Sequence, residues 1–135
     1  KSVAQVRSLR QYARLEAVQG CTTKMIVGRA CNDPQALIHA GQALAIERLR
    51  SGLAFVGLVE EWDLSVCLFH RMLGAAPLAL EREAVRQAGH RNDRQLISKL
   101  RGFTGPGDEA VYAAARERFR VEVRTVVERL RLSKR

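Results

Sequence analysis

An uninterrupted apolar run, LAFVGLV, extends from Leu53 to Val59 and sets the strongest limit on the fold. Gly52 precedes the run, and the acidic pair Glu60 and Glu61 follows it. Short apolar runs with such ends are typical of strands that are buried on both faces of a parallel sheet. We therefore predict one central, parallel-type strand at about residues 53–59, with helices on its flanks.

Helical patterns lie on both sides of this run. Asp33 and Pro34 suit the cap and the first residue of a helix that precedes the predicted strand. A Leu-rich helix follows the acidic pair and is expected to stop at Gly74. A last helix is predicted from about Asp108 to Leu132. The fold class is therefore α/β and mostly helical, but one strand cannot make a sheet, so the architecture looks incomplete.

Size and charge limit the class of protein. The chain has 135 residues, which suffice for one modest domain, and a formal net charge of +9. Such a charge attracts nucleic acid, anionic lipid, acidic glycans or nucleotide phosphates and does not choose among them. Many basic residues alternate with Glu, which is typical of solvated helix faces. No run reaches the ~18 apolar residues of a membrane span, so we expect none in this chain.

The cysteines and histidines give no sign of a metal site. Cys21 and Cys31 are near each other in sequence and can pair in an oxidising compartment, whereas Cys67 falls in an apolar helical pattern and is interpreted as buried. No Cys/His spacing of a zinc site occurs. His39 and His70 have no nucleophile or carboxylate at a useful spacing, so no catalytic residue is assigned.

Three ordered segments carry a resemblance to a known family. The segment FVGLVEEWDLSVCLFHRMLG, from Phe55 to Gly74, resembles a stretch of the sulfotransferase superfamily, particularly its glycan-type, Golgi-resident branch. TKMIVG, from Thr23 to Gly28, looks like an upstream stretch of the same branch, and residues 92–119 are similar to its closing region. Val59 departs from the usual Thr. The closing region carries an acidic-aromatic motif, here Asp108, Glu109, Tyr112 and Phe119.

The resemblance implies a fold and an activity. Residues 1–135 would form a single partial domain, the C-terminal portion of a P-loop-like α/β sulfotransferase domain in the Golgi lumen. The family transfers a sulfuryl group from 3′-phosphoadenosine 5′-phosphosulfate to a hydroxyl or amine of a glycan or small molecule, without a metal. No Gly-rich loop with a following Lys and Ser or Thr occurs here, so the chain alone is expected to be inactive. An incomplete sheet would also expose an edge through which the chain can self-associate.

The resemblance also suggests binding residues. In the loop HRNDR, Arg91, Asn92 and Arg94 are placed on the donor nucleotide, because arginine binds phosphate bidentately; the alternative is an exposed loop that caps the next helix. Glu60 is placed at the acceptor, because ligands bind beyond the carboxyl ends of strands in α/β sheets, and Trp62 is placed there as a ring on which a sugar can stack. The alternatives are a helix-dipole partner for Glu60 and a packing anchor for Trp62.

A second class of function remains open. The segment RERFRVEVRTVVERLRLSKR, residues 116–135, is basic and helical in pattern and would be the key element of a binding module for nucleic acid or another polyanion. Glutamates interrupt its positive face, and only 5% of the chain is aromatic, whereas single-strand recognition uses several aromatic rings for base stacking. Nucleic acid is therefore the less favoured partner.

Overall fold

The computed structural model describes residues 7–33, 38–82, 98–100, 103, 105 and 107–133, and all regular structure in these residues is helical. The elements in chain order are α1 (Leu9–Ala13), α2 (Cys21–Ile26), α3 (Ile38–Glu47), the π-helical turn η2 (Arg48–Gly52), the 3₁₀ turn η3 (Val59–Glu61), α4 (Trp62–Met72), α5 (Ala79–Arg82) and α7 (Glu109–Leu132).

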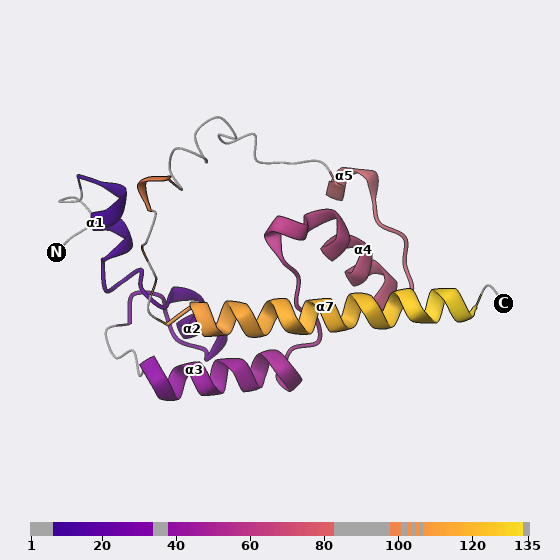
Figure 1. The fold of residues 1–135 in the computed structure, drawn as a ribbon, viewed down its shortest axis with the longest axis horizontal. Helices are drawn as coiled ribbons and strands as arrows, with labels where there is room; N and C mark the ends of the chain where they lie inside the picture. The colour runs from indigo at the N-terminus through magenta and orange to yellow at the C-terminus, as the bar shows by residue number, and fades with distance from the viewer. Residues whose placement is uncertain are drawn as a thin grey trace.

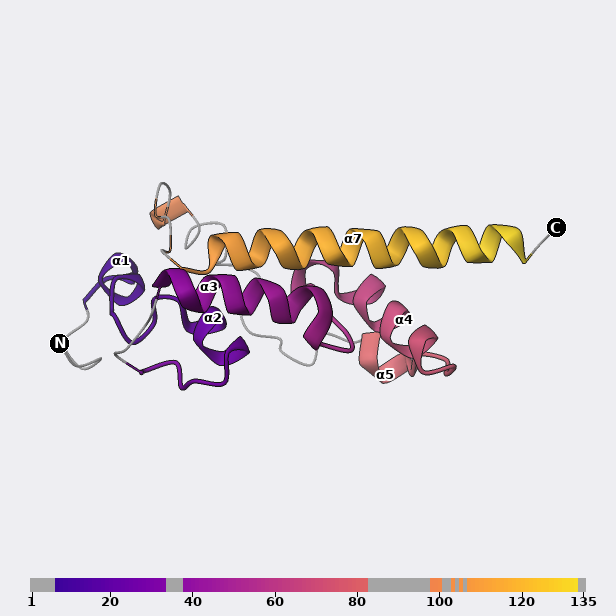
Figure 2. The ribbon, with the colours of Figure 1, turned by 90° about the horizontal axis from the view of Figure 1, so that it is seen from below.

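The longest element, α7, runs through most of the length of the molecule. Helix α3 lies along its N-terminal half and α4 lies nearer its C-terminal half (Figures 1 and 2). No Gly or Pro interrupts the 24 residues of α7, and apolar residues recur on one of its faces, so it forms an unbroken amphipathic helix. The predicted bounds of the last helix, from about Asp108 to Leu132, are confirmed.

Two hydrophobic clusters form the core, and α7 contributes to both. The buried residues of the first cluster are Ala45, Leu49, Val56 and Val111. Those of the second cluster are Leu58, Leu68 and Phe119. Ala115 packs against both clusters, so one turn of α7 joins them.

The predicted strand at 53–59, and with it the α/β fold class, is wrong. The described ranges contain no strand. The backbone is extended at Leu53 (φ −103°, ψ 133°) and at Leu58 (φ −114°, ψ 132°), but Val59 already begins the turn η3. Only Val56 and Leu58 of the run are buried, while Val59 is 83% exposed. The expected sheet edge for self-association is therefore also missing from this part of the chain.

Side chains, rather than a neighbouring strand, bind the backbone of the extended segment. The hydroxyl of Ser65 accepts a hydrogen bond from the Leu58 N–H at 2.9 Å and lies 2.9 Å from the Leu58 carbonyl oxygen. The guanidinium of Arg118 donates to the carbonyls of Leu49 and Ala54. The apolar run thus packs on helices, and polar side chains from α4 and α7 satisfy backbone groups that a sheet would otherwise pair.

The helix ends test the remaining local predictions. Helix α4 ends at Met72, and Gly74 follows with φ of +69°, so the predicted stop at Gly74 is confirmed. The predicted start at Asp33 and Pro34 is not tested, because residues 34–37 lie outside the described ranges.

Cys67 is exposed on α4, so its interpretation as a buried residue is wrong. None of the helices in the described ranges is long and apolar enough to cross a membrane.

Candidate functional site

Asp108 binds the first turn of α2 and so ties the start of α7 to a segment far away in sequence. Helix α2 has Gly20 at its N-cap, with φ of 64° and no side chain to cap the helix. The Asp108 carboxylate takes this role: Oδ1 accepts from the Thr23 N–H at 2.8 Å and lies 2.8 Å from the Thr23 hydroxyl, while Oδ2 accepts from the Thr22 N–H at 3.4 Å. Two backbone donors at a helix start are thereby satisfied by a charged acceptor.

The backbones of Gly107 and Gly20 lie against each other beside this cap. A Cβ atom on Gly107 would be 3.1 Å from the Cα atom of Gly20, and Gly107 has φ of +110°, so a side chain is disfavoured there on both grounds. The Gly107 carbonyl also accepts from the Thr23 hydroxyl at 2.7 Å and from the Gln42 side-chain amide at 3.0 Å. Helices α2, α3 and α7 therefore meet at one glycine carbonyl.

Glu60, which the sequence places at the acceptor, contacts α7. Its Oε1 accepts a hydrogen bond from the hydroxyl of Tyr112, and Tyr112 in turn has the guanidinium of Arg116 over its ring at 5.7 Å. Both Glu60 and Tyr112 are exposed. The carboxylate is therefore held in place on the surface and still has Oε2 for another donor, so a binding role and a structural role are both open to it.

Trp62, the other residue placed at the acceptor, is half-exposed at the start of α4. Its indole N–H donates to the Glu81 carbonyl at 2.8 Å, which connects α4 to α5. Because this bond uses the only polar group of the side chain, further recognition by Trp62 is limited to its ring face.

A histidine–carboxylate pair that the sequence does not predict lies nearby. His70 Nε2 is 2.7 Å from Glu81 Oε2, and the same oxygen accepts from the Leu78 N–H at 2.7 Å. The Leu78 N–H and, after it, the hydrogen bond to His70 hold the pKa of the Glu81 carboxyl below its ordinary value. The sequence offers one sign of part of this arrangement: Glu81 follows Leu78 by three residues, which is the spacing of a helix cap. The closeness of Glu81 to His70 depends on how the chain turns after α4.

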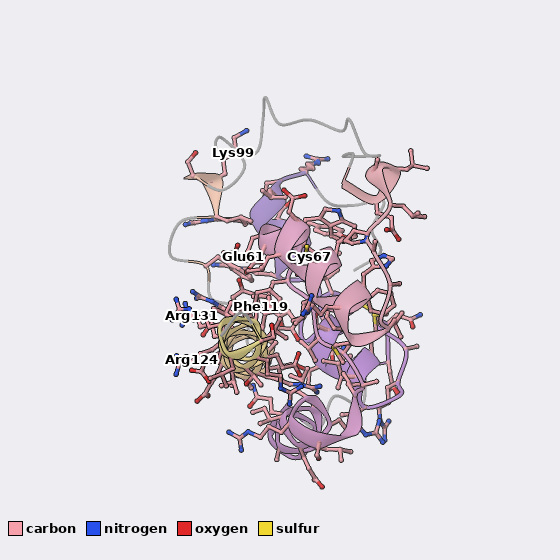
Figure 3. All side chains as sticks on the ribbon, turned by 90° about the vertical axis from the view of Figure 1, so that its right-hand side faces the viewer. Glu61, Cys67, Lys99, Phe119, Arg124 and Arg131 are labelled. Carbon is pink, nitrogen blue, oxygen red and sulfur yellow. A yellow bond between two sulfur atoms is a disulfide. The ribbon has the colours of Figure 1, made fainter. Side chains whose placement is uncertain are left out.

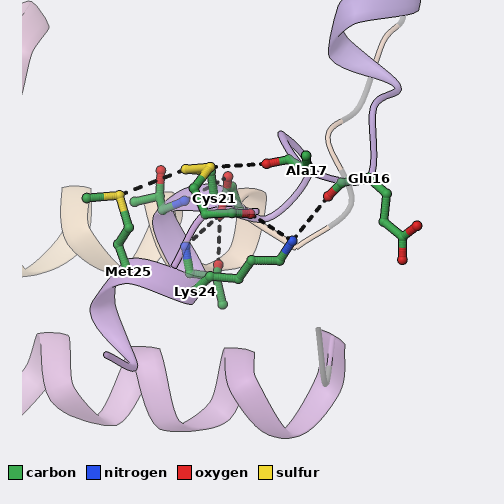
Figure 4. The surroundings of a disulfide bond; sticks show 9 residues. Glu16, Ala17, Cys21, Lys24 and Met25 are labelled. Atoms are coloured by element: carbon green, nitrogen blue, oxygen red, sulfur yellow. Dashed lines mark hydrogen bonds between the residues drawn. A yellow bond between two sulfur atoms is a disulfide. The ribbon is translucent and has the colours of Figure 1, made fainter. Parts of the chain in front are cut away.

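The disulfide between Cys21 and Cys31 encloses a buried lysine (Figure 4). The Lys24 side chain is 3% exposed, and its Nζ donates to the carbonyls of Glu16 and Cys31 at 3.1 Å each. The pairing that the sequence left open is therefore present. Because its ammonium group is bound to two carbonyls inside the fold, Lys24 acts as a local structural residue in this arrangement.

A groove of about 430 Å³ lies between the start of α4 and the C-terminal half of α7. Its apolar lining comes from Leu64 and from Phe119, Val123 and Val127 of α7. Its charged lining has both signs: Arg120, Arg124, Glu128 and Arg131 come from α7, and Glu61 comes from the residue just before α4. Figure 3, a view along α7, shows Phe119 between α7 and α4, with Arg124 and Arg131 on one side of α7.

The residues predicted to bind the donor nucleotide make none of the contacts described above. Arg91, Asn92 and Arg94, placed on the donor nucleotide, are not among the described residues. The described residues contain no group of His, Cys, Asp and Glu side chains that could hold a metal ion. No family model, curated protein or solved structure matches this chain.

Proposed function

We propose that this chain is part of a sulfotransferase that transfers a sulfuryl group from 3′-phosphoadenosine 5′-phosphosulfate to an acceptor hydroxyl or amine, with a glycan as the favoured acceptor. The basis is the resemblance of three ordered segments to the glycan-type branch of that family. The proposal makes no use of a sheet. It assigns the chain binding and scaffolding roles and no catalytic residue.

One observation carries the proposal: residues of the closing acidic-aromatic motif contact both of the other segments. Asp108 caps the start of TKMIVG at Thr23. Tyr112 donates to Glu60 in the central segment, and Phe119 packs with Leu58 and Leu68 of that segment. These contacts bring the three resembling segments together in the fold, as the proposal requires.

The proposed acceptor role follows from the exposure of two described residues, and the donor role follows from residue chemistry alone. Glu60 and the exposed ring face of Trp62 are the groups offered to the acceptor. Arg91, Asn92 and Arg94 are assigned to the phosphates of the donor, because guanidinium groups bind phosphate bidentately. The Cys21–Cys31 disulfide is compatible with an oxidising compartment such as the Golgi lumen, which the resemblance implies.

The alternative function, a basic helical module for nucleic acid, has less support. Along α7, Glu122 binds Arg118 at 2.7 Å, and Arg116 lies over the Tyr112 ring. These arginines are thus engaged within the protein. The positive face that a phosphate backbone would follow is correspondingly interrupted.

Calorimetric titration with adenosine 3′,5′-bisphosphate tests the proposal. We expect the protein expressed from the complete coding sequence to bind this nucleotide, and the 135-residue chain alone to have no sulfotransferase activity. Arg91→Ala and Arg94→Ala should each weaken nucleotide binding by about 1.5–3 kcal/mol, the value of a charge-assisted hydrogen bond. Arg124→Ala, which removes the same charge from α7, is the control and should bind normally.

Two results would contradict parts of the proposal. A protein from the complete coding sequence that ignores the nucleotide would refute the sulfotransferase assignment. Normal binding by both Arg91→Ala and Arg94→Ala, in a protein that does bind the nucleotide, would refute only the choice of donor residues.

A further inference from the structure

Lys24 is a buried charge that has no carboxylate beside it among the described residues. It is 3% exposed and makes no ion pair with any described Asp or Glu. Its Nζ donates instead to the carbonyls of Glu16 and Cys31, at 3.1 Å each (Figure 4). Burial of an ammonium group is costly unless its N–H groups have acceptors, so both carbonyls are needed to keep Lys24 inside the fold.

The disulfide holds one of these two carbonyls in place. Cys21 and Lys24 are three residues apart on α2, so they lie on the same side of that helix. The S–S bond to Cys21 fixes Cys31 on this side. Cys31 is therefore bound to α2 twice at the same place, through its sulfur and through its carbonyl oxygen.

Apart from these two links, few contacts hold the loop of residues 28–33 to the described part of the fold. None of its six residues is buried. The ion pair of Arg29 with Asp33 and the hydrogen bond from the Asp33 N–H to the Ala30 carbonyl both stay within the loop. The Arg29 N–H donates to the Lys24 carbonyl at 2.8 Å, which joins the loop only to the end of α2.

Helix α2 itself is anchored by contacts that do not involve the disulfide. The Asp108 carboxylate accepts from the Thr23 N–H at 2.8 Å, and Arg48 donates to the Ile26 carbonyl at 2.8 Å. Ile26 and Val27 also pack against the first hydrophobic cluster. Cleavage of the S–S bond should therefore release the loop and leave α2 in place.

We propose that the Cys21–Cys31 disulfide is a redox switch that controls the exposure of an acylation site, the Nζ amine of Lys24. A dithiol reductant opens the switch: one of its thiolates attacks a sulfur of the disulfide, and its second thiol resolves the mixed disulfide. Two electrons and two protons pass to the cysteines, which become thiols, while the reductant becomes a disulfide. The loop then carries the Cys31 carbonyl away, and Lys24 turns out to water because it has lost an acceptor.

Acylation then keeps the loop open. The unprotonated amine attacks an activated acyl donor such as a thioester, which forms an amide bond and expels a thiol that takes the proton. An acylated lysine has no charge and a single N–H, so it cannot restore the contacts with both carbonyls. The switch stays closed in an oxidising compartment and opens where dithiols act. The proposal is independent of the sulfotransferase assignment, because it uses none of the residues assigned to donor or acceptor.

Acetylation of the full chain by N-hydroxysuccinimidyl acetate, followed by mass spectrometry of its peptides, tests the proposal. The exposed Lys99 is the internal reference. We expect dithiothreitol to raise the acetylation rate of Lys24 relative to Lys99 by about tenfold or more, because Lys24 is shielded until the loop opens. The double variant Cys21→Ser, Cys31→Ser should show the fast rate without reductant. Cys67→Ser, which removes a cysteine outside the disulfide, should behave as the wild type.

Hydrogen exchange measured by NMR separates local opening from unfolding. In the reduced chain the amides of residues 29–33 should exchange faster, while those of Thr22 and Thr23, which bind Asp108, should keep their protection. Slow acetylation of Lys24 in the reduced chain, or an equal rate in the oxidised chain, would overturn the proposal. Loss of protection at Thr22 and Thr23 on reduction would also overturn it, because Lys24 would then be exposed by unfolding of α2.

Discussion

Asp108 binds residues that are far from it in sequence, and no local pattern predicts these contacts. It precedes α7, and one oxygen of its carboxylate lies 2.8 Å from both the N–H and the hydroxyl of Thr23. Its position before a helical pattern suggested a start for α7, whereas its carboxylate caps the start of α2 instead. The position of Asp108 in the sequence correctly indicated the start of a helix. Which helix its carboxylate caps depends on the tertiary fold.

Replacing Asp108 by Ala should destabilise the whole chain. The substitution leaves the N–H groups of Thr22 and Thr23 without their acceptor, and Thr23 is buried. We expect a loss of about 1–3 kcal/mol in the free energy of unfolding. Urea denaturation measures it, and Glu109→Ala, one residue further on, is the control with an expected change within about 0.5 kcal/mol. Equal losses in the two variants would show that the cap contributes nothing.

At the level of elements, Gly57 and Gly41 occupy opposite environments. A Cβ atom on Gly57 would lie 2.9 Å from Phe55 Cε1 and 3.1 Å from Ser65 Cβ, both closer than ordinary contacts. A Cβ atom on Gly41, within α3, would meet nothing within 4 Å. The two glycines thus form a matched pair for testing how the extended segment is packed against α4.

Alanine should have opposite effects at these two positions. Gly57→Ala should lower the free energy of unfolding by about 1–3 kcal/mol, because the Phe55 ring and α4 must shift to admit a methyl group. Gly41→Ala should raise it by about 0.5–1 kcal/mol, because alanine favours the helix. Thermal unfolding by circular dichroism compares the two variants with the wild type. A stable Gly57→Ala protein would mean that the segment is not held against α4 as described.

The sequence predicted elements where local residues determine them. The helix from about Asp108 to Leu132 and the stop at Gly74 follow from unbroken periodicity and from a glycine with positive φ. The run from Leu53 to Val59 failed as a strand because sheet formation requires partners that no local pattern specifies. Its backbone is bound instead by Ser65 at Leu58 and by Arg118 at Ala54, and Arg118 is 64 residues away from Ala54.

In the candidate site, too, local sequence patterns did not predict which residues contact one another. Glu60 was selected for its place after an apolar run, yet its contact with Tyr112 spans 52 residues and has no local signal. The pair of His70 and Glu81 depends on how the chain turns between α4 and α5, so residue spacing alone could not reveal it. Residue types were informative, but their partners were set by the tertiary fold.

On the scale of the whole molecule, α7 contributes to both hydrophobic clusters and connects them. Val111 belongs to the first cluster and Phe119 to the second, and Ala115 between them packs against both. Loss of packing at one end of α7 should therefore be felt at the other. The single tryptophan, Trp62, at the start of α4, provides a probe near the second cluster.

Val111→Ala tests this cooperativity. Val111 is 1% exposed, so the substitution should cost about 1–3 kcal/mol of stability by leaving a cavity. We expect the urea midpoint measured by Trp62 fluorescence to fall by the same amount as that measured by far-UV circular dichroism. Coincident transitions are the mark of two-state unfolding. A Trp62 transition that stays at its wild-type midpoint would show that the two clusters unfold independently.

The position of α7 in the chain also affects how the protein acquires its core during synthesis. Leu49 and Arg118 are 69 residues apart, and a ribosome adds about 5–20 residues per second, so about 3–14 s separate the two in translation. During that interval Leu49, Val56 and Leu58 have been made, but the helix that covers them has not. The nascent chain is therefore most exposed to aggregation and to chaperone binding just before α7 emerges, and codons that slow translation between α4 and α7 would lengthen that period.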